Sequence, residues 1–231
     1  MMKLIIGSEY VDEINELKEL GCEIITFYGT SELEAEINQH ADINVFNCGN
    51  GDLIVNSDII GEIEPFLADF SLIPCKGIKS PYPDDIKLNC ALIGKYLLCN
   101  TKYVADEIRL FCEQNDIRFL HTNQGYSKCS VCVLNDKALI TENDTIASLL
   151  KIYQKDVLLI KGGYVCLSDK HHGFIGGASG MINESTVYFS GDISAHPDYD
   201  SIIKFLDKYN IKPVFNKSRK LSDFGGFIKL Q

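Results

Sequence analysis

The sequence predicts a closed α/β fold built from five units, each running strand, turn, strand, helix, strand. Three observations predict it. This order occurs five times in the 231 residues, the turns are almost evenly spaced, and the two ends of the chain together complete one unit. Any α/β protein alternates strands and helices, but that alternation does not predict an additional leading strand in every unit.

The unit is clearest in the middle of the chain. Residues 95–99 form a short apolar run typical of a strand, and Val104, Ile108 and Phe111 have the spacing of one face of an amphipathic helix. An extended stretch follows at residues 117–120. We expect Thr101 to cap the helix, because its hydroxyl can accept a bond from an unpaired backbone N–H.

The same strand–helix–strand order is expected in four other places. In the first, strands at residues 3–6 and 23–27 flank a helix with Val11, Ile14 and Leu17 on one face; in the second, strands at residues 53–55 and 72–73 flank a helix with Ile60, Ile63 and Leu67. In the third, strands at residues 138–141 and 157–160 flank a helix with Ile146, Leu149 and Tyr153; in the fourth, strands at residues 186–189 and 212–215 flank a helix with Ile202, Phe205 and Leu206.

A leading strand and a tight turn precede each of these segments. The leading strands are expected at residues 42–46, 88–92, 129–133, 177–181 and 225–230, and four turns contain residue types that tolerate a positive φ: Asn50, Gly94, Asn135 and Asn183. The last leading strand finds its partner at the N-terminus, so the fifth turn falls where Gln231 would meet Met1. The steps between turns are then 44, 41, 48, 48 and 50 residues. We expect residues 1–231 to form one domain, in which the leading strands begin near a common axis.

Composition narrows the classes of function. The chain has 22 basic and 32 acidic residues and a formal charge of −10, which disfavours nucleic acid as a partner and is compatible with a cationic ligand. Its nine cysteines are too scattered for a secreted disulfide framework. The N-terminal apolar stretch is too short for a signal peptide, and no apolar run reaches the roughly 18 residues of a membrane helix. The sequence therefore indicates a cytoplasmic protein with no membrane partner, and it does not indicate an oligomeric state.

Five such units, one of them split between the termini, resemble the pentein fold, the five-fold pseudosymmetric α/β propeller of guanidino-group-modifying enzymes. The stretches Gly125-Tyr126-Ser127-Lys128-Cys129 and 173–180 are most similar to an uncharacterised bacterial branch of that superfamily. The superfamily includes deiminases, dimethylarginine hydrolases and amidinotransferases, together with non-catalytic members. The resemblance covers the whole chain.

In the enzymes of this superfamily a cysteine thiolate attacks the guanidinium carbon, a histidine acts as acid and base, and carboxylates hold the cation. The histidine lies in an H-x-D motif, which His40-Ala41-Asp42 is similar to. The nucleophile usually follows a glycine pair near the C-terminus. Here Gly225 and Gly226 are present and the cysteine is absent, which departs from the pattern of the enzymes.

His40 and Asp42 are two residues apart on a predicted strand, so their side chains should share a face. If that face lines the axis, His40 could shuttle protons and Asp42 could bind a cation. The alternative is a surface turn in which Asp42 caps backbone amides.

Cys129 is the candidate nucleophile, because the neighbouring Lys128 ammonium would lower its pKa and raise its thiolate fraction. The alternative is a small buried side chain. Cys129 and Cys132 form a C-x-x-C pair, but residues three apart on a strand face opposite sides. We therefore expect neither a metal nor a redox site there, and no cofactor.

The remaining binding candidates are Asn89, Lys128, His172, Ser179 and Asp223, with His172 expected to face the axis and His171 to be solvated. Two functions remain open. The first is a small-molecule site for a guanidine- or amine-containing, cationic compound, which in an enzyme would support cysteine-dependent hydrolysis or amidino-group transfer. The second is a non-catalytic module that binds a ligand or a protein on the same scaffold.

Overall fold

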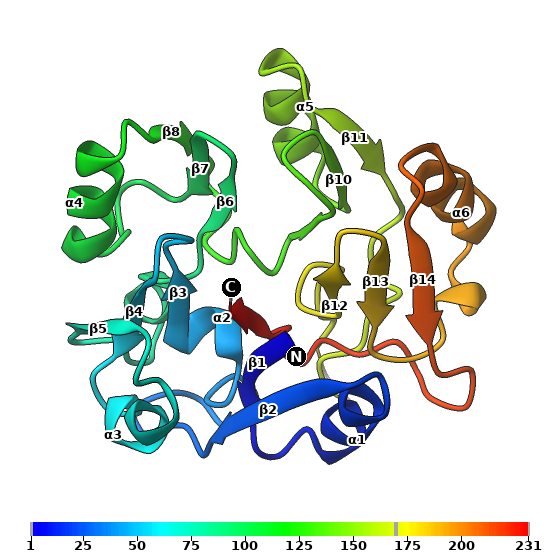
Figure 1. The fold of residues 1–231 in the computed structure, drawn as a ribbon. Coiled ribbons are helices and arrows are strands. Elements are labelled where there is room, and N and C mark those ends of the chain that lie inside the picture. The colour runs from blue at the N-terminus through cyan, green and yellow to red at the C-terminus, as the bar shows by residue number, and fades with distance from the viewer. Residues whose placement is uncertain (1, 169–170, 231) are drawn as a thin grey trace.

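The computed structural model describes residues 2–168 and 171–230, and its strands form five three-stranded sheets. In every sheet the middle strand pairs antiparallel with one neighbour and parallel with the other. Figure 1 shows these sheets around the middle of the molecule, where the C-terminal strand lies, with the longer helices toward the periphery. The predicted repetition of strand, strand, helix and strand is confirmed at this level.

The strands are given sheet by sheet, from the leading strand outward. They are β15 (Ile228–Leu230), β1 (Met2–Gly7) and β2 (Cys22–Phe27); β3 (Val45–Asn47), β4 (Asp52–Asn56) and β5 (Ser71–Cys75); β6 (Ala91–Ile93), β7 (Tyr96–Cys99) and β8 (Arg118–His121); β9 (Val131–Val133), β10 (Ala138–Thr141) and β11 (Asp156–Leu159); β12 (Ser179–Asn183), β13 (Thr186–Phe189) and β14 (Lys212–Phe215).

One helix connects the second and third strand of each sheet. These helices are α1 (Val11–Glu19), α3 (Ile60–Ile63), α4 (Asp106–Gln114), α5 (Asp144–Ile152) and α6 (Tyr199–Lys208), and α3 continues into a 3₁₀ turn at Glu64–Phe66. Two further 3₁₀ turns lie at Asp84–Ile86 and Ile193–Ala195, and a four-residue helix that the sequence did not indicate, α2, spans Ala41–Asn44. No helix in the described part of the chain is long and apolar enough to cross a membrane.

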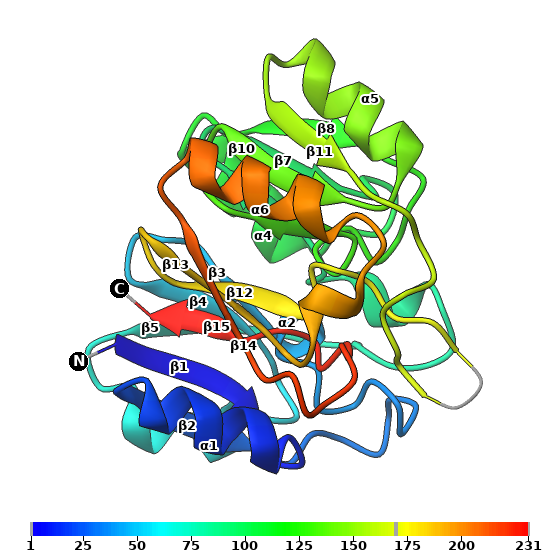
Figure 2. The same ribbon diagram turned by 90° about the vertical axis from the view of Figure 1, so that its right-hand side faces the viewer.

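The two ends of the chain share one sheet, as predicted. β1 pairs antiparallel with β15, with Lys3 opposite Leu230 and Ile5 opposite Ile228. Figures 1 and 2 place both termini at this sheet. The N-terminal strand therefore completes the unit that the C-terminal strand begins.

The hydrophobic core consists of five clusters, and each lies between two successive units. In one of them Phe46 of β3 packs edge to face against Phe111 of α4, with ring centroids 6.0 Å apart. The other clusters join the remaining neighbouring units in the same way, including the first and the last. Each unit thus buries its apolar faces against two others.

The leading strands begin two or three residues later than expected, because each is preceded by a turn. The expectation that His40 and Asp42 share a strand face is wrong for this reason. The amide and the side-chain Nδ2 of Asn44 both donate to the His40 carbonyl, at 3.3 and 2.9 Å, and close the helical turn α2. Cys129 likewise lies in a turn before β9.

Two local expectations also need correction. Thr101 does not cap α4, which begins after Ala105; its hydroxyl lies 2.8 Å from Nδ1 of His121 instead. Of the turn residues only Gly94 has a positive φ, of 61°. The three asparagines accept a hydrogen bond from the backbone N–H two residues on, a polar turn that needs no positive φ: Asn50 from Asp52, Asn135 from Lys137 and Asn183 from Ser185.

Candidate functional site

The turns before the five leading strands meet near the middle of the molecule and are hydrogen-bonded in a closed ring. The bonds run from Asp42 N to Gly225 O (3.2 Å), from Gly226 N to Gly177 O (2.8 Å), from Gly177 N to Cys129 O (3.0 Å), from Cys129 N to Asn89 Oδ1 (3.3 Å) and from Asn89 Nδ2 to Asp42 O (3.3 Å). Every unit contributes a partner, so the ring fixes the five turns relative to one another.

Cys129 is buried in this ring. Its Sγ donates to Asp42 Oδ2 at 3.0 Å and accepts from Asn89 Nδ2 at 3.1 Å. Burial, and next the negative charge of Asp42, raise the pKa of the thiol well above its ordinary value. This corrects the expectation that Lys128 activates Cys129: the Lys128 ammonium donates to the Gly176 carbonyl at 3.4 Å.

His40 and Asp223 form the second part of the site. His40 Nδ1 lies 3.8 Å from Asp223 Oδ1, and the Asp223 carboxylate also accepts from the backbone of Phe174 at 2.9 Å and of Gly225 at 3.0 Å. Gly225 has φ +70°, and a Cβ there would lie 2.3 Å from Cβ of His40. Only glycine therefore lets the backbone pass this close to the imidazole.

A cavity of about 260 Å³, called the central cavity below, opens onto His40 and Cys129. Its lining combines carboxylates, aromatic rings and aliphatic side chains: Glu34, Glu36, Ile37, His40, Ile43, Tyr126, Cys129, Leu167, His171, Phe174 and Asp223. Carboxylates and ring faces both attract cations, so this chemistry suits a positively charged organic group.

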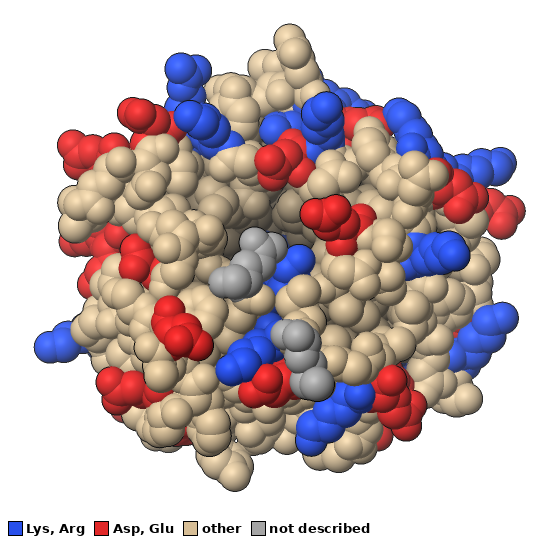
Figure 3. Space-filling model, in the orientation of Figure 1, with Lys and Arg blue, Asp and Glu red and all other residues tan. Residues whose placement is uncertain are grey.

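Asp42 and Lys128 face a different hollow, of about 180 Å³, that is also lined by Lys229 of β15. Figure 3 shows the face that carries β15, hollowed near its middle and with basic side chains in the hollow. Burial raises the pKa of Asp42 to about 6, while Lys128 and His40 oppose the rise. Asp42 does not line the central cavity, but its carboxylate accepts a hydrogen bond from Cys129, which does.

The structure brings together five of the eight candidate residues: His40, Asp42, Asn89, Cys129 and Asp223. His172 is exposed and forms a backbone bridge with Cys166, so the expectation that it faces the axis is wrong. His171 is exposed, as expected, but it also lines the central cavity. His171 Nδ1 lies 2.9 Å from Glu36 Oε2. The Ser179 hydroxyl donates to the Ile175 carbonyl at 2.7 Å and does not line the cavity.

Tyr126 and Phe174 line the cavity and were not singled out from the sequence. Their positions carry a signal, since each lies in a glycine-containing stretch just before a leading strand. The Tyr126 hydroxyl donates to Asp85 Oδ2 at 2.6 Å, which orients the ring. Glu34 and Glu36 lie in the irregular segment before His40, where no periodic pattern marks them.

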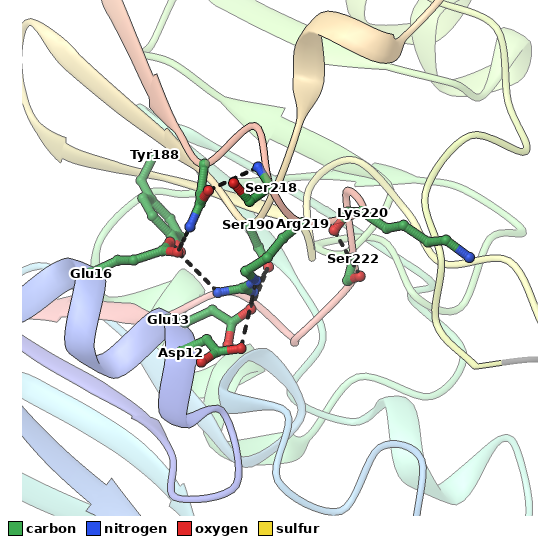
Figure 4. A network of polar contacts seen from close by, with 10 residues as sticks. Asp12, Glu13, Glu16, Tyr188, Ser190, Ser218, Arg219, Lys220 and Ser222 are labelled. Carbon is green, nitrogen blue, oxygen red and sulfur yellow. Dashed lines mark hydrogen bonds and ion pairs between the residues drawn. The ribbon is translucent and has the colours of Figure 1, made fainter.

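The segment just before Asp223 takes part in an ion-pair network centred on Arg219 (Figure 4). Arg219 pairs with Glu13 and with Glu16 of α1, the latter at 3.1 Å. The Ser190 hydroxyl donates to Glu13 at 2.6 Å, and Tyr188 donates to Glu16 at 2.5 Å. This network fastens residues 216–222 to the first helix of the split unit.

Comparison with known proteins first gives a family. The profile of a family of unknown function (DUF6873) matches residues 5–228, almost the whole chain. The chain belongs to this family. No curated protein matches it.

Solved structures that resemble this member of DUF6873 include guanidino-modifying enzymes. They include DDAH from Pseudomonas aeruginosa in complex with citrulline (TM-score 0.58, 9% identity, covering 97% of this chain and 95% of that one). Agmatine deiminase from C. jejuni has a TM-score of 0.55 at 12% identity, covering 98% of this chain and 92% of that one. An amidinotransferase of saxitoxin biosynthesis from Microseira wollei has a TM-score of 0.57 at 13% identity, covering 90% of this chain and 74% of that one. The resemblance to the pentein fold is confirmed, and at these identities the likeness is one of fold.

Proposed function

We propose that the five units form a five-fold pseudosymmetric propeller that folds as one domain, with its ligand site on the axis. The closed ring of hydrogen bonds between the leading turns supports this arrangement. So do the five core clusters, each shared by two neighbouring units.

We propose further that the protein is a hydrolase or group transferase that acts on a guanidine- or amine-containing compound. The observation that carries this proposal is a buried thiol and an imidazole side by side at a cavity lined with carboxylates and aromatic rings. DDAH and agmatine deiminase, which share the fold, are named for guanidino compounds. The carboxylates of Glu34, Glu36 and Asp223 would bind the cationic group.

Each residue has a role in this reaction. The Cys129 thiol passes its proton to the Asp42 carboxylate, which already accepts its hydrogen bond, and the sulfur attacks the amidino carbon. Protonated His40 donates a proton to the departing nitrogen. Water, in a hydrolase, or a second amine, in a transferase, then attacks the same carbon and gives a proton to His40, while the sulfur departs and takes its own proton back from Asp42. The approach of a cationic substrate favours the thiolate by lowering the cost of the negative charge.

Turnover of a panel of guanidines, amines and amides tests the proposal. Cys129→Ala should lower turnover at least about 10³-fold, since the covalent route is lost. Cys132→Ala, a matched change at a buried cysteine outside the cavity, should not. The intact mass of the protein trapped during turnover should show one adduct on Cys129. Unchanged turnover in Cys129→Ala would eliminate the covalent mechanism.

A non-catalytic binding module is the second candidate, and two observations favour it. Burial and Asp42 keep the Cys129 thiol protonated, and the glycine pair near the C-terminus lacks a cysteine. In this case a thermal-shift screen with the same panel should give a ligand that stabilises the protein and is recovered unchanged. Conversion of that ligand would count against the binding module.

A further inference from the structure

Three side chains with metal-binding donors converge beside the central cavity. His40, Asp42 and Cys129 each offer one ligand atom, and these atoms all lie within 4.8 Å of one another. Each residue is only 2% exposed. Imidazole nitrogen, carboxylate oxygen and thiolate sulfur are the three donor types that zinc uses in proteins.

Two of these side chains carry a buried polar atom without a hydrogen-bond partner. His40 Nε2 and Asp42 Oδ1 are both in this state. A buried polar atom that lacks a partner costs free energy, because it loses its hydration and gains no hydrogen bond in return. One cation placed between them would satisfy both atoms together.

The surrounding residues are suited to orient such ligands. The other ring nitrogen of His40 faces the Asp223 carboxylate at 3.8 Å, and metal-binding histidines commonly face a carboxylate in this way. Asn89 Nδ2 donates to the Cys129 sulfur at 3.1 Å, and its Oδ1 holds the Cys129 backbone. The ligand-bearing turns are therefore fixed before a metal arrives.

We propose that His40, Asp42 and Cys129 bind one divalent zinc-type ion, with a further coordination position directed to the central cavity. Binding forms the metal–sulfur bond and releases the Cys129 proton to solvent, and Asp42 exchanges its hydrogen bond with the thiol for the metal. A sulfur held by the metal is no longer a free nucleophile. Occupancy of the site would therefore suppress the covalent reaction proposed above.

Cobalt(II) is a suitable probe, because its thiolate complexes absorb in the near ultraviolet. Metal-free protein titrated with cobalt(II) should develop a sulfur-to-cobalt charge-transfer band that saturates at one equivalent. Cys129→Ser should abolish the band, and Cys132→Ser, the matched control, should keep it. Asp223→Asn should keep the band and weaken the affinity about 10–100-fold, as for other partners of metal-bound histidines.

Circular dichroism of each variant verifies folding, and zinc should displace cobalt with the same stoichiometry. Absence of a saturable thiolate band in folded wild-type protein, or a band that survives Cys129→Ser, would overturn the site. This readout requires no turnover. A failed guanidine assay and a failed metal titration are therefore separate results.

Discussion

At the residue scale, the centre of the molecule is defined by polar groups that are buried with few partners. The Asp42 carboxylate accepts one bond from Cys129, while its second oxygen has none. Such a site is costly to build, because a carboxylate loses hydration on burial and gains little in return here. Buried groups with shifted pKa values are typical of sites that bind or transform a ligand.

Because Asp42 is buried, we expect the free energy of unfolding to depend on pH. The pKa of Asp42 is raised from 3.8 to about 6, so the folded protein binds the proton more tightly than the unfolded chain does. The stabilising contribution of the protonated group is complete below pH 3.8 and is lost as the pH rises through 6. At about 1.4 kcal/mol per pKa unit, the loss amounts to as much as about 3 kcal/mol. Asp42→Asn should remove this part of the pH dependence.

Urea unfolding of wild type and Asp42→Asn between pH 4.5 and 7.5 measures the difference. Glu142 is the necessary control, because burial also raises its pKa, to about 7. In Glu142→Gln the free energy of unfolding should still fall with rising pH by the amount that is due to Asp42. If the free energy of unfolding depends on pH identically in wild type and Asp42→Asn, then Asp42 has the same pKa in the folded and unfolded states.

At the scale of elements, the sequence predicts the order of strands and helices well because each unit has its own apolar periodicity. In each sheet the connection from the second to the third strand contains a helix, as predicted; these helices include Val11, Ile60, Ile108, Ile146 and Ile202. The starts of the leading strands were predicted too early, because side chains such as that of Asn44 close a turn that no periodicity reveals.

The candidate site was predictable only in part, for the same reason. The H-x-D motif and Cys129 are chemically distinctive in the sequence, and they do meet. Glu34 and Glu36 reach the cavity from an irregular segment, and exposed glutamates have no distinguishing pattern. His172 was preferred over His171 although adjacent residues in an irregular loop cannot be assigned to a face from spacing.

Arg219 connects the segment before Asp223 to helix α1. Its partner Glu13 is only 5% exposed, so Arg219→Met leaves a buried carboxylate without its cation. Breaking a buried pair in this way costs about 3–5 kcal/mol, and the partly exposed guanidinium places the expected loss nearer about 2–3 kcal/mol. Urea unfolding at neutral pH measures it.

Two variants control for the loss of a long basic side chain. Lys220→Met, at the exposed neighbour of Arg219, should change the free energy of unfolding by less than about 0.5 kcal/mol. The double variant Arg219→Met with Glu13→Gln should recover part of the stability, because the unpaired charge is gone. If Arg219→Met and Lys220→Met lower the free energy of unfolding by the same amount, the ion-pair network does not stabilise the fold.

At the scale of the whole molecule, the ring of turns and the core clusters connect all five units to one another. Every unit shares a core cluster with the unit before it and the unit after it, and the first and last units share one as well. The same units would therefore pack against one another wherever the ends of the chain were placed. The split unit closes through β1 and β15, with Leu4 opposite Lys229.

A circular permutant tests this directly. The ends would be joined by a short flexible linker and the chain opened between Glu184 and Ser185, in the exposed turn between β12 and β13. Because this cut breaks no core cluster and no bond of the central ring, the permutant should unfold in one transition within about 2 kcal/mol of wild type. A second permutant, opened between Gly225 and Gly226, cuts the ring itself and should be destabilised far more. Equal stability of the two permutants would mean that the ring of turns does not hold the five units together.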